Sequence, residues 1–234
     1  MQKIIDVCSR VEGHSQINYF IQNDEFQYAD YQISAFRGFE NILLGKKLQD
    51  VPKIISRVCG LCHASQTIVS CKAIEDIFNI GVSKQSAIIR RLLMTGELIK
   101  SHTMHFYLQS VPDLLHLFQK SDKILNNYEL SQYNHDLTQK SYELIKIGND
   151  IDRLYGGRAI HGITSVPGGV VYTPSTKKIL LVQKYFQKAL NNLEFLIKFF
   201  TNEFSSSDPP KYFSLPNKLT FLGMNNGQIY DRYN

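Results

Sequence analysis

Tryptophan is absent from this sequence, and cysteine is scarce, with four residues in 234 and none after Cys71. Four cysteines in a chain of this length do not form the dense disulfide framework of small secreted proteins. The apolar runs fall far short of the roughly 20 residues that a membrane-spanning helix needs. Because no apolar stretch follows Met1, no secretory signal peptide is expected either. These absences predict a cytoplasmic protein without a membrane span, whose thiols stay reduced.

Charge of one sign is not concentrated anywhere along the chain. The net charge is +5, and the Lys and Arg residues are spread out rather than clustered. A nucleic acid or an anionic membrane is therefore not indicated as a partner. Apolar residues make up 43% and charged residues 20% of the sequence, which is typical of a globular chain with a core of its own.

Strand signals come first in the sequence. Residues Gln16–Ile21 and Phe26–Ser34 are rich in Tyr, Phe and Ile, and Asn23–Glu25 between them resembles a hairpin turn. Two short strands are marginal alone, so they are expected to pack against a larger unit. Residues Phe39–Leu44 predict a short helix that Gly45 ends.

Helical signals dominate the middle of the chain. Residues 51–80 favour helix, with Pro52 suited to a first turn. Ser83 can cap the next helix, which carries an apolar stripe at helical spacing and is expected to reach Ser110, just before Pro112. Within 51–80, the main helix is predicted at Ser65–Phe78, with the cysteine pair inside it or just before it. Further helices are predicted at Ser131–Tyr155 and Thr176–Phe204.

Glycine and proline gather in one loop, Gly156–Pro174, where the backbone can approach another surface closely. The tail, Tyr212–Asn234, returns to strand-forming residues. The fold class is therefore α+β, a mainly helical bundle with small β elements at both ends. One unit is predicted, with a β-rich part at 1–45, a helical bundle at 51–204 that includes the loop 156–174, and a β-rich tail at 208–234.

The central stretch of the sequence is Arg57–Gln66, because it holds two cysteines three residues apart, Cys59 and Cys62. Two thiolates at this spacing can close on one metal ion. A redox dithiol would need a thioredoxin-like context, and half of a zinc site would need a second ligand pair; neither is visible. With His63, the string also matches Cys-x-x-Cys-His, the attachment pattern of c-type haem. Two core thiols are the remaining alternative.

The cysteine pair belongs to a series of ordered motifs. They are RVEGH at 10–14, FRGFE at 36–40, RVCGLC at 57–62, ELIKSH at 97–102, and GRAIH at 157–161 with SVPGG at 165–169. Together they resemble the N-terminal half of the large, catalytic subunit of [NiFe] hydrogenases. The resemblance implies the fold of that half and the reversible cleavage of H2 into protons and electrons.

The resemblance also implies a set of metal ligands. In that family, four cysteines hold nickel, and two of them bridge to an iron that carries CO and cyanide. By motif position, Cys59 resembles the terminal nickel ligand and Cys62 the bridging one, so two of the four thiolates of a Ni-Fe(CO)(CN)2 centre are expected here. Glu40 resembles a magnesium ligand, since a hard cation prefers carboxylate oxygen. Iron–sulfur clusters are expected on a small partner subunit that takes the electrons.

Other motif residues are expected to act around these ligands. Glu12 resembles the first proton relay of the family, because a carboxylate near a metal-bound thiolate can take its proton. His14, in the same motif, is expected to orient backbone. Arg37 and Arg57 flank the expected ligands and can hold carboxylates by bidentate pairing, with solvated arginines as the alternative.

Gln66 departs from the family, which mostly has His four residues after the second cysteine. Gln can still donate to a bridging sulfur but cannot carry charge, and some hydrogen-sensing members share it. His161, in the glycine-rich loop, is expected to face the electron-transferring subunit. His102 and His105 have the spacing of a metal pair, although the motif favours packing roles. His63 receives no role, and Cys8 and Cys71 are expected to be core thiols.

The family's second cysteine pair, in an Asp-Pro-Cys-x-x-Cys motif, has no counterpart in this sequence, because Asp208–Pro209 is followed by Pro210. The C-terminal half of the large subunit is therefore expected on a second chain, and the retained Glu12 and Glu40 favour such a split subunit. A fragment of a longer product is one alternative. A non-catalytic scaffold or hydrogen-sensing paralogue of the same fold is another.

Overall fold

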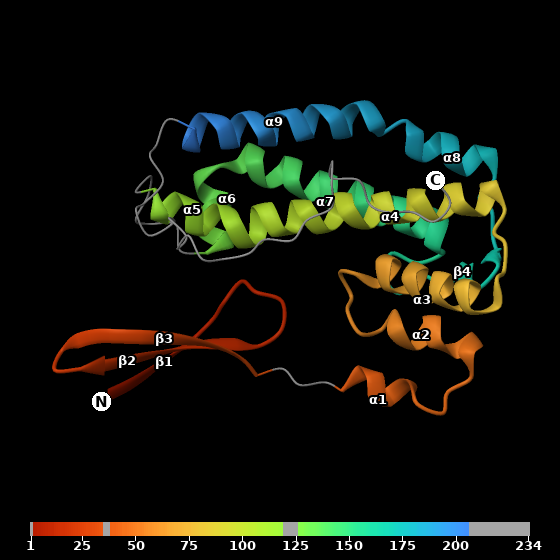
Figure 1. The fold of residues 1–234 in the computed structure, drawn as a ribbon. Coiled ribbons are helices and arrows are strands. Elements are labelled where there is room, and N and C mark those ends of the chain that lie inside the picture. Colours follow the sequence, from red (N-terminus) through yellow and green to blue (C-terminus); the bar gives the residue numbers. More distant parts are fainter. Residues whose placement is uncertain (1, 35–37, 119–125, 206–234) are drawn as a thin grey trace.

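The two longest helices, α4 (Lys84–Met104) and α7 (His135–Gly156), lie side by side at the centre of the molecule (Figure 1). This computed structural model describes residues 2–34, 38–118 and 126–205. Helix α3 (His63–Phe78) packs on α4, and α9 (Phe186–Phe204) covers α7. The mainly helical α+β class predicted from the sequence is confirmed.

Backbone contact brings α4 and α7 together. A Cβ atom built on Gly148 would lie 2.8 Å from the carbonyl oxygen of Gly96 and 2.9 Å from the backbone nitrogen of Lys100. No side chain larger than glycine fits at such a separation without a shift of the backbone. The two glycines therefore set the distance between the two central helices.

Helix α4 starts as predicted but ends differently. The Ser83 hydroxyl accepts a hydrogen bond from the Ser86 amide, which confirms the predicted N-cap. The prediction of a helix end before Pro112 was wrong, because a π-helical segment at His105–Ser110 leads directly into α5 (Val111–Leu117). Pro112 occupies the first turn of α5, where its missing N–H leaves no hydrogen bond unmade.

The helix predicted at Ser65–Phe78 is confirmed as α3, and the cysteine pair lies just before it. The stretch 51–80 contains in addition α2 (Val51–Ile55) and a turn. The predicted helix at Ser131–Tyr155 is broken at Asn134, whose side chain caps α7 by accepting from the Leu137 amide. The remaining helices are α1 (Phe39–Leu43), the 3-10 turn η1 (Leu48–Asp50), α6 (Asn127–Tyr133) and α8 (Thr176–Gln183).

Two apolar clusters make up the core formed by the described residues. The first surrounds the π-helical segment and includes Tyr107, Leu115 and Leu137. The second lies beneath α3 and contains Ala64, two residues after Cys62, together with Leu93 of α4. Each fully buried Leu contributes about 1.5–3 kcal/mol of transfer free energy, so Leu93 helps to fix α4 next to the start of α3.

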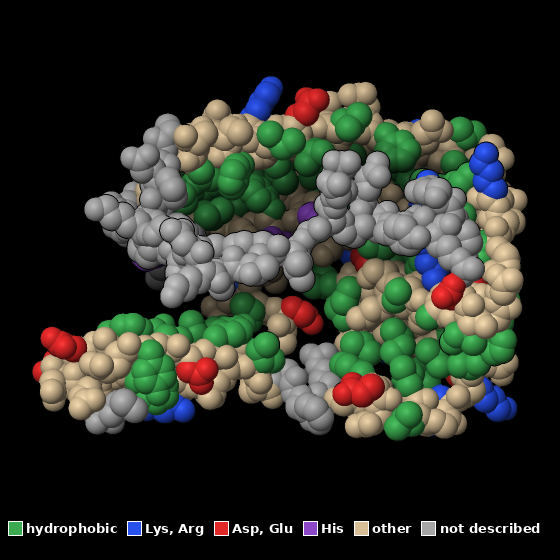
Figure 2. Space-filling view, viewed as in Figure 1, with side chains coloured by type: hydrophobic (Ala, Val, Ile, Leu, Met, Phe, Trp, Pro, Cys, Tyr) green, Lys and Arg blue, Asp and Glu red, His purple; other side chains and the backbone are tan. Residues whose placement is uncertain are grey.

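The N-terminal part is a three-stranded antiparallel sheet of β1 (Gln2–Val7), β2 (Ser15–Gln22) and β3 (Glu25–Ile33). The sequence predicted β2 and β3 as separate strands, and β1 lies in the part at 1–45 that it predicted as β-rich. Figure 1 shows the sheet beside the bundle, with the loop at 8–14 at the end nearer the helices. Green apolar side chains gather on the sheet in Figure 2, and many remain exposed, among them Ile5, Val7, Tyr31 and Ile33.

A second small hairpin, β4 (Ser165–Val166) and β5 (Gly169–Val170), interrupts the glycine-rich loop. It is held by Arg90, which donates to Glu75 and to the carbonyl oxygens of Val166 and Gly169. The predicted tail at 208–234, including Tyr212–Asn234, lies outside the described residues. Within the described ranges, none of the helices is both long and apolar enough to cross a membrane.

Candidate metal centre

The two cysteines of the central motif lie on the turn between α2 and α3. Cys62 is the N-cap residue of α3, and the Cα atoms of Cys59 and Cys62 are 5.5 Å apart. Their sulfur atoms are within bonding distance of each other, as a disulfide. The Cys62 amide donates to the Cys59 sulfur at 3.3 Å. In the reduced state, the same backbone presents two thiolates at one point of the surface.

Gln66 lies one helical turn after Cys62 and contacts its sulfur. The Nε2 atom of Gln66 donates to Cys62 Sγ at 3.4 Å, within the wide limits for a sulfur acceptor. The Oε1 atom of the same amide is buried and has no hydrogen-bond partner in the described part of the chain. In the reduced state, Gln66 can therefore stabilise negative charge on the Cys62 sulfur without adding charge of its own.

Glu97 of α4 holds the start of α3, a role that the sequence analysis missed. Its carboxylate accepts hydrogen bonds from the amides of Ala64 at 2.5 Å and Ser65 at 3.2 Å, and the side chain is buried. These amides are among the four at a helix N-terminus that have no partner within the helix, and the helix dipole favours a negative charge there. The first turn of α3, next to the cysteines, is thereby fixed.

His63, which received no role from the sequence, is fully buried beside the cysteine pair. Its Nε2 atom lies 3.3 Å from Lys100 Nζ, and Lys100 Nζ lies 2.7 Å from Asp152 Oδ2. A haem bound at Cys59 and Cys62 would need His63 as its axial ligand, and His63 would have to leave this core position to reach it. The contacts therefore count against the haem alternative.

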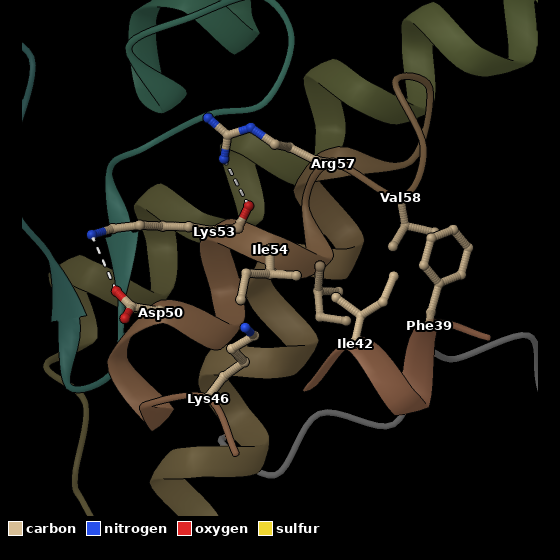
Figure 3. A pocket seen from close by; sticks show the side chains of 9 residues that line it. Phe39, Ile42, Lys46, Asp50, Lys53, Ile54, Arg57 and Val58 are labelled. Atoms are coloured by element: carbon tan, nitrogen blue, oxygen red, sulfur yellow. Dashed lines mark hydrogen bonds and ion pairs between the residues drawn. The ribbon is translucent and has the colours of Figure 1, made fainter. Parts of the chain in front are cut away.

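His161 and Arg57 border the cysteine turn from two sides. His161 contacts the carbonyl oxygen of Ser56 through Nδ1 at 2.6 Å, which joins the glycine-rich loop to the start of the turn. Arg57 is exposed, and its guanidinium donates to the Lys53 carbonyl oxygen rather than to a carboxylate (Figure 3). Both side chains therefore shape the backbone around the cysteines.

An open pocket of about 570 Å³ lies between α1, α2 and this turn. Its floor is apolar, with the Phe39 ring, Ile42 and Val58 close together in Figure 3. At its edge, Lys53 forms a 3.9 Å ion pair with Asp50, and both side chains are well exposed to solvent. Such an exposed ion pair adds little to stability.

The acidic residues expected near the metals are distributed over the N-terminal part. Glu12 and His14 are exposed on the loop at 8–14, where Arg10 forms a 2.5 Å ion pair with Asp113 of α5. Glu40 is exposed in the first turn of α1. Arg37 lies outside the described residues. The described residues bring no three His, Cys, Asp or Glu side chains together in a metal-binding group.

The other histidines and cysteines have structural surroundings. His102 contacts the Leu98 carbonyl oxygen one turn earlier at 2.9 Å, and His105 lies 3.4 Å from the Ser110 hydroxyl. Burial raises the pKa of the Cys71 thiol to about 11, so this side chain stays protonated at neutral pH. Cys8 is half-buried and lies outside the disulfide.

Comparison with known proteins places these features in one family. A family description, nickel-dependent hydrogenase, matches residues 37–191. The alpha chain of sulfhydrogenase 2 of Pyrococcus furiosus is 33% identical over 196 residues, which cover 83% of this chain and 44% of that protein. A component of the F420-non-reducing hydrogenase vhu of Methanocaldococcus jannaschii is 31% identical over 167 residues, which cover 71% and 40%.

Solved structures agree with the sequence comparison. The NAD+-reducing [NiFe]-hydrogenase in the H2-reduced state superposes with a TM-score of 0.82 at 25% identity, over 88% of this chain and 46% of that one. The Ni-Fe-Se hydrogenase of D. vulgaris Hildenborough gives 0.73 at 26% identity, over 88% and 45%. The chain thus spans less than half the length of the relatives that it matches. It belongs to the nickel-dependent hydrogenase family.

Proposed function

We propose that this chain contributes Cys59 and Cys62 to the nickel–iron centre of a [NiFe] hydrogenase, as the N-terminal half of its large subunit. The observation that carries the proposal is the pairing of the two sulfurs at the start of α3, with the Gln66 amide on the Cys62 sulfur. The donor set fits the soft metal pocket of the centre, because thiolates are its preferred ligands and the Gln66 amide can stabilise their charge.

When bound, the centre supplies the electron-rich metal pocket in which H2 is split into protons and electrons. Glu12 is proposed to accept a proton and to pass it outward, since an exposed carboxylate can bind and release protons to water. Glu40, with its carboxylate free of the bundle core, is proposed as a magnesium ligand. Arg37 and His14 are proposed to hold neighbouring groups, and His161 to face the electron-accepting subunit.

The other two thiolates are proposed to come from outside these 234 residues, because Cys8 and Cys71 do not form a second Cys-x-x-Cys pair. We infer a split large subunit, whose second chain carries the other Cys-x-x-Cys pair, and an iron–sulfur small subunit that takes the electrons. The relatives are named as single subunits of hydrogenases, which supports an assembly of several chains. A cytoplasmic location is proposed, since a reducing compartment keeps the pair as thiolates.

The test is an infrared spectrum, together with nickel analysis, of the complex purified from its native source through this chain. CO and cyanide stretches with about one nickel per chain support the proposal. Peptide mass spectrometry of the same sample shows whether the second cysteine pair lies on another polypeptide. A folded complex that lacks both the bands and nickel, when purified without oxygen or chelators, refutes it.

The second candidate function is a hydrogen sensor, and Gln66 is the observation that favours it. The Gln66 amide donates a hydrogen bond to the Cys62 sulfur but cannot exchange a proton as an imidazole can. A sensor retains the metals and turns over slowly. A non-catalytic scaffold differs from both, because its partner binding and its function are unaffected by Cys59→Ala, whereas a metal-bearing subunit loses nickel in that variant.

A further inference from the structure

His63 connects the cysteine turn to the centre of the bundle. It follows Cys62 directly, is the first residue of α3, and exposes none of its side chain. Its Nε2 atom lies 3.3 Å from Lys100 Nζ of α4 and 3.6 Å from Asp152 Oδ2 of α7. One residue beside an expected metal ligand thus contacts both central helices.

The three hydrogen-bond donors of Lys100 are fully used. Its ammonium group lies 2.7 Å from Asp152 Oδ2, 3.2 Å from the Ala159 carbonyl oxygen and 3.3 Å from His63 Nε2. An ammonium group has three donors and no acceptor, so the His63 Nε2 atom accepts the third bond. The charges of Lys100 and Asp152 compensate each other, which allows both side chains to be almost fully buried.

The position of this buried cluster is fixed by the glycine contact between the helices. A Cβ atom built on Gly96 would lie 2.6 Å from Asp152 Oδ1 and 2.7 Å from Ile151 Cγ2. Asp152 therefore packs directly against the backbone of Gly96, where only glycine leaves room for its carboxylate, and Lys100 is bound to that carboxylate. A continuous series of contacts leads from the centre of the bundle through Lys100 and His63 to Cys62.

We propose that Lys100 and Asp152 act through His63 as positioning residues for Cys62. The cluster determines where the first turn of α3 lies, and hence the direction in which the Cys62 sulfur meets the metal. Residues around metal ligands set the orientation of those ligands and the properties of the metal. This inference rests on the proposed function, in that Cys62 is taken as a metal ligand.

The experiment compares variants in the complex purified through this chain. His63→Leu removes the acceptor for Lys100, whereas His63→Gln restores an acceptor at a similar reach. The double variant Lys100→Met with Asp152→Leu replaces the ion pair by apolar side chains, which proteins often tolerate without loss of the fold. The matched control is Arg90→Met with Glu75→Leu, because that pair is also buried and joins α3 to α4 but holds the β4–β5 hairpin.

Two readouts separate positioning from general stability. The first is hydrogen exchange of the backbone in peptides that cover 59–66 and 166–170, which requires no metal. The second is the position of the CO and cyanide stretches, which reports on the iron beside a bridging sulfur. His63→Leu and the double variant are expected to raise exchange at 59–66 at least tenfold and to shift the stretches. His63→Gln is expected to behave as the unsubstituted chain.

The control pair is expected to raise exchange at 166–170 and to leave both 59–66 and the stretches unchanged. The inference is overturned if His63→Leu leaves exchange and stretches unchanged, or if the control pair alters 59–66 equally. If the unsubstituted complex carries no metal, the proposed function fails, and the exchange data still decide whether the cluster positions the cysteine turn.

Discussion

The side-chain amide of Gln66 donates a hydrogen bond to the sulfur of Cys62 across one turn of α3. A helix places residues i and i+4 on the same face, so the contact follows from the four-residue spacing between them. The other end of the same amide, Oε1, is buried without a partner in the described part of the chain. The contact therefore uses only the donor end of the amide.

We expect Gln66→His to raise H2 turnover in the purified complex. An imidazole can donate to the sulfur and can also carry a proton near neutral pH, which an amide cannot do. The measurement is H2 uptake with an artificial electron acceptor, normalised to nickel content. Gln66→Leu is the control, because it fills similar space and removes the donor. Unchanged turnover in Gln66→His would count against the sensor candidate.

Glu12→Gln is expected to lower turnover by about 10²–10⁴-fold, the range that a positioned acid or base contributes. Gln cannot take up or release a proton, while its size is almost that of Glu. Nickel content and the infrared bands should stay as in the unsubstituted complex, because Glu12 is not an expected ligand. Glu25→Gln, at the first residue of β3, is the matched control and should have no effect. Full activity of Glu12→Gln would remove Glu12 from the proton path.

Gly148→Ala is expected to destabilise the chain by about 1–3 kcal/mol, as overpacking in a close-packed interior does. The added methyl group would lie 2.8 Å from the Gly96 carbonyl oxygen and from Lys100 Cβ. Gly81→Ala is the control, since a Cβ atom there has nothing within 4 Å. Urea unfolding of the complex, followed by circular dichroism, measures the difference. Equal midpoints for the two variants would show that α4 and α7 can move apart without cost.

Because its thiol is buried, Cys71 is expected to lower the free energy of unfolding of the chain in alkaline solution. Burial raises its pKa from 9.0 to about 11 in the folded chain, so the folded state holds this proton more tightly than the unfolded state. The contribution of the protonated thiol to stability is complete below pH 9 and is lost as the pH rises from 9 to about 11. Cys71→Ala should flatten the decline of stability over this window. Parallel unfolding curves for both chains across the window would contradict the assignment.

The sequence predicted those parts of the fold that local signals specify. Ser83 started α4, Gly45 followed α1, and the turn at 23–25 joined two strands, because caps and turns act over a few residues. The π-helical segment before Pro112 and the break at Asn134 were missed. At the first place, Pro112 fits the first turn of α5, so the chain stays helical. At the second, the Asn134 side chain accepts a hydrogen bond from the first turn of α7, so a new helix begins there.

The sequence predicted the contact of the candidate site that lies within one motif. It missed the contacts that depend on packing between distant segments. The motif spacing brought Gln66 to the Cys62 sulfur. It gave no indication of His63, because the contacts of His63 with Lys100 and Asp152 join segments far apart in the chain. Glu97 is the first residue of the motif ELIKSH, yet its hydrogen bonds to the first turn of α3 depend on how α3 and α4 pack. Pairings of this kind follow from the fold rather than from local patterns.

The small sheet at the N-terminus affects how readily the chain aggregates or is degraded in the cell. Both β1 and β3 are edge strands, and Val7 and Ile33 expose about three quarters of their surface. Open edges with apolar side chains promote aggregation and expose a chain to chaperones and proteases. In the proposed assembly, copies made in excess of the other chains are therefore expected to be removed, so that the abundance of this chain follows that of the proposed partner.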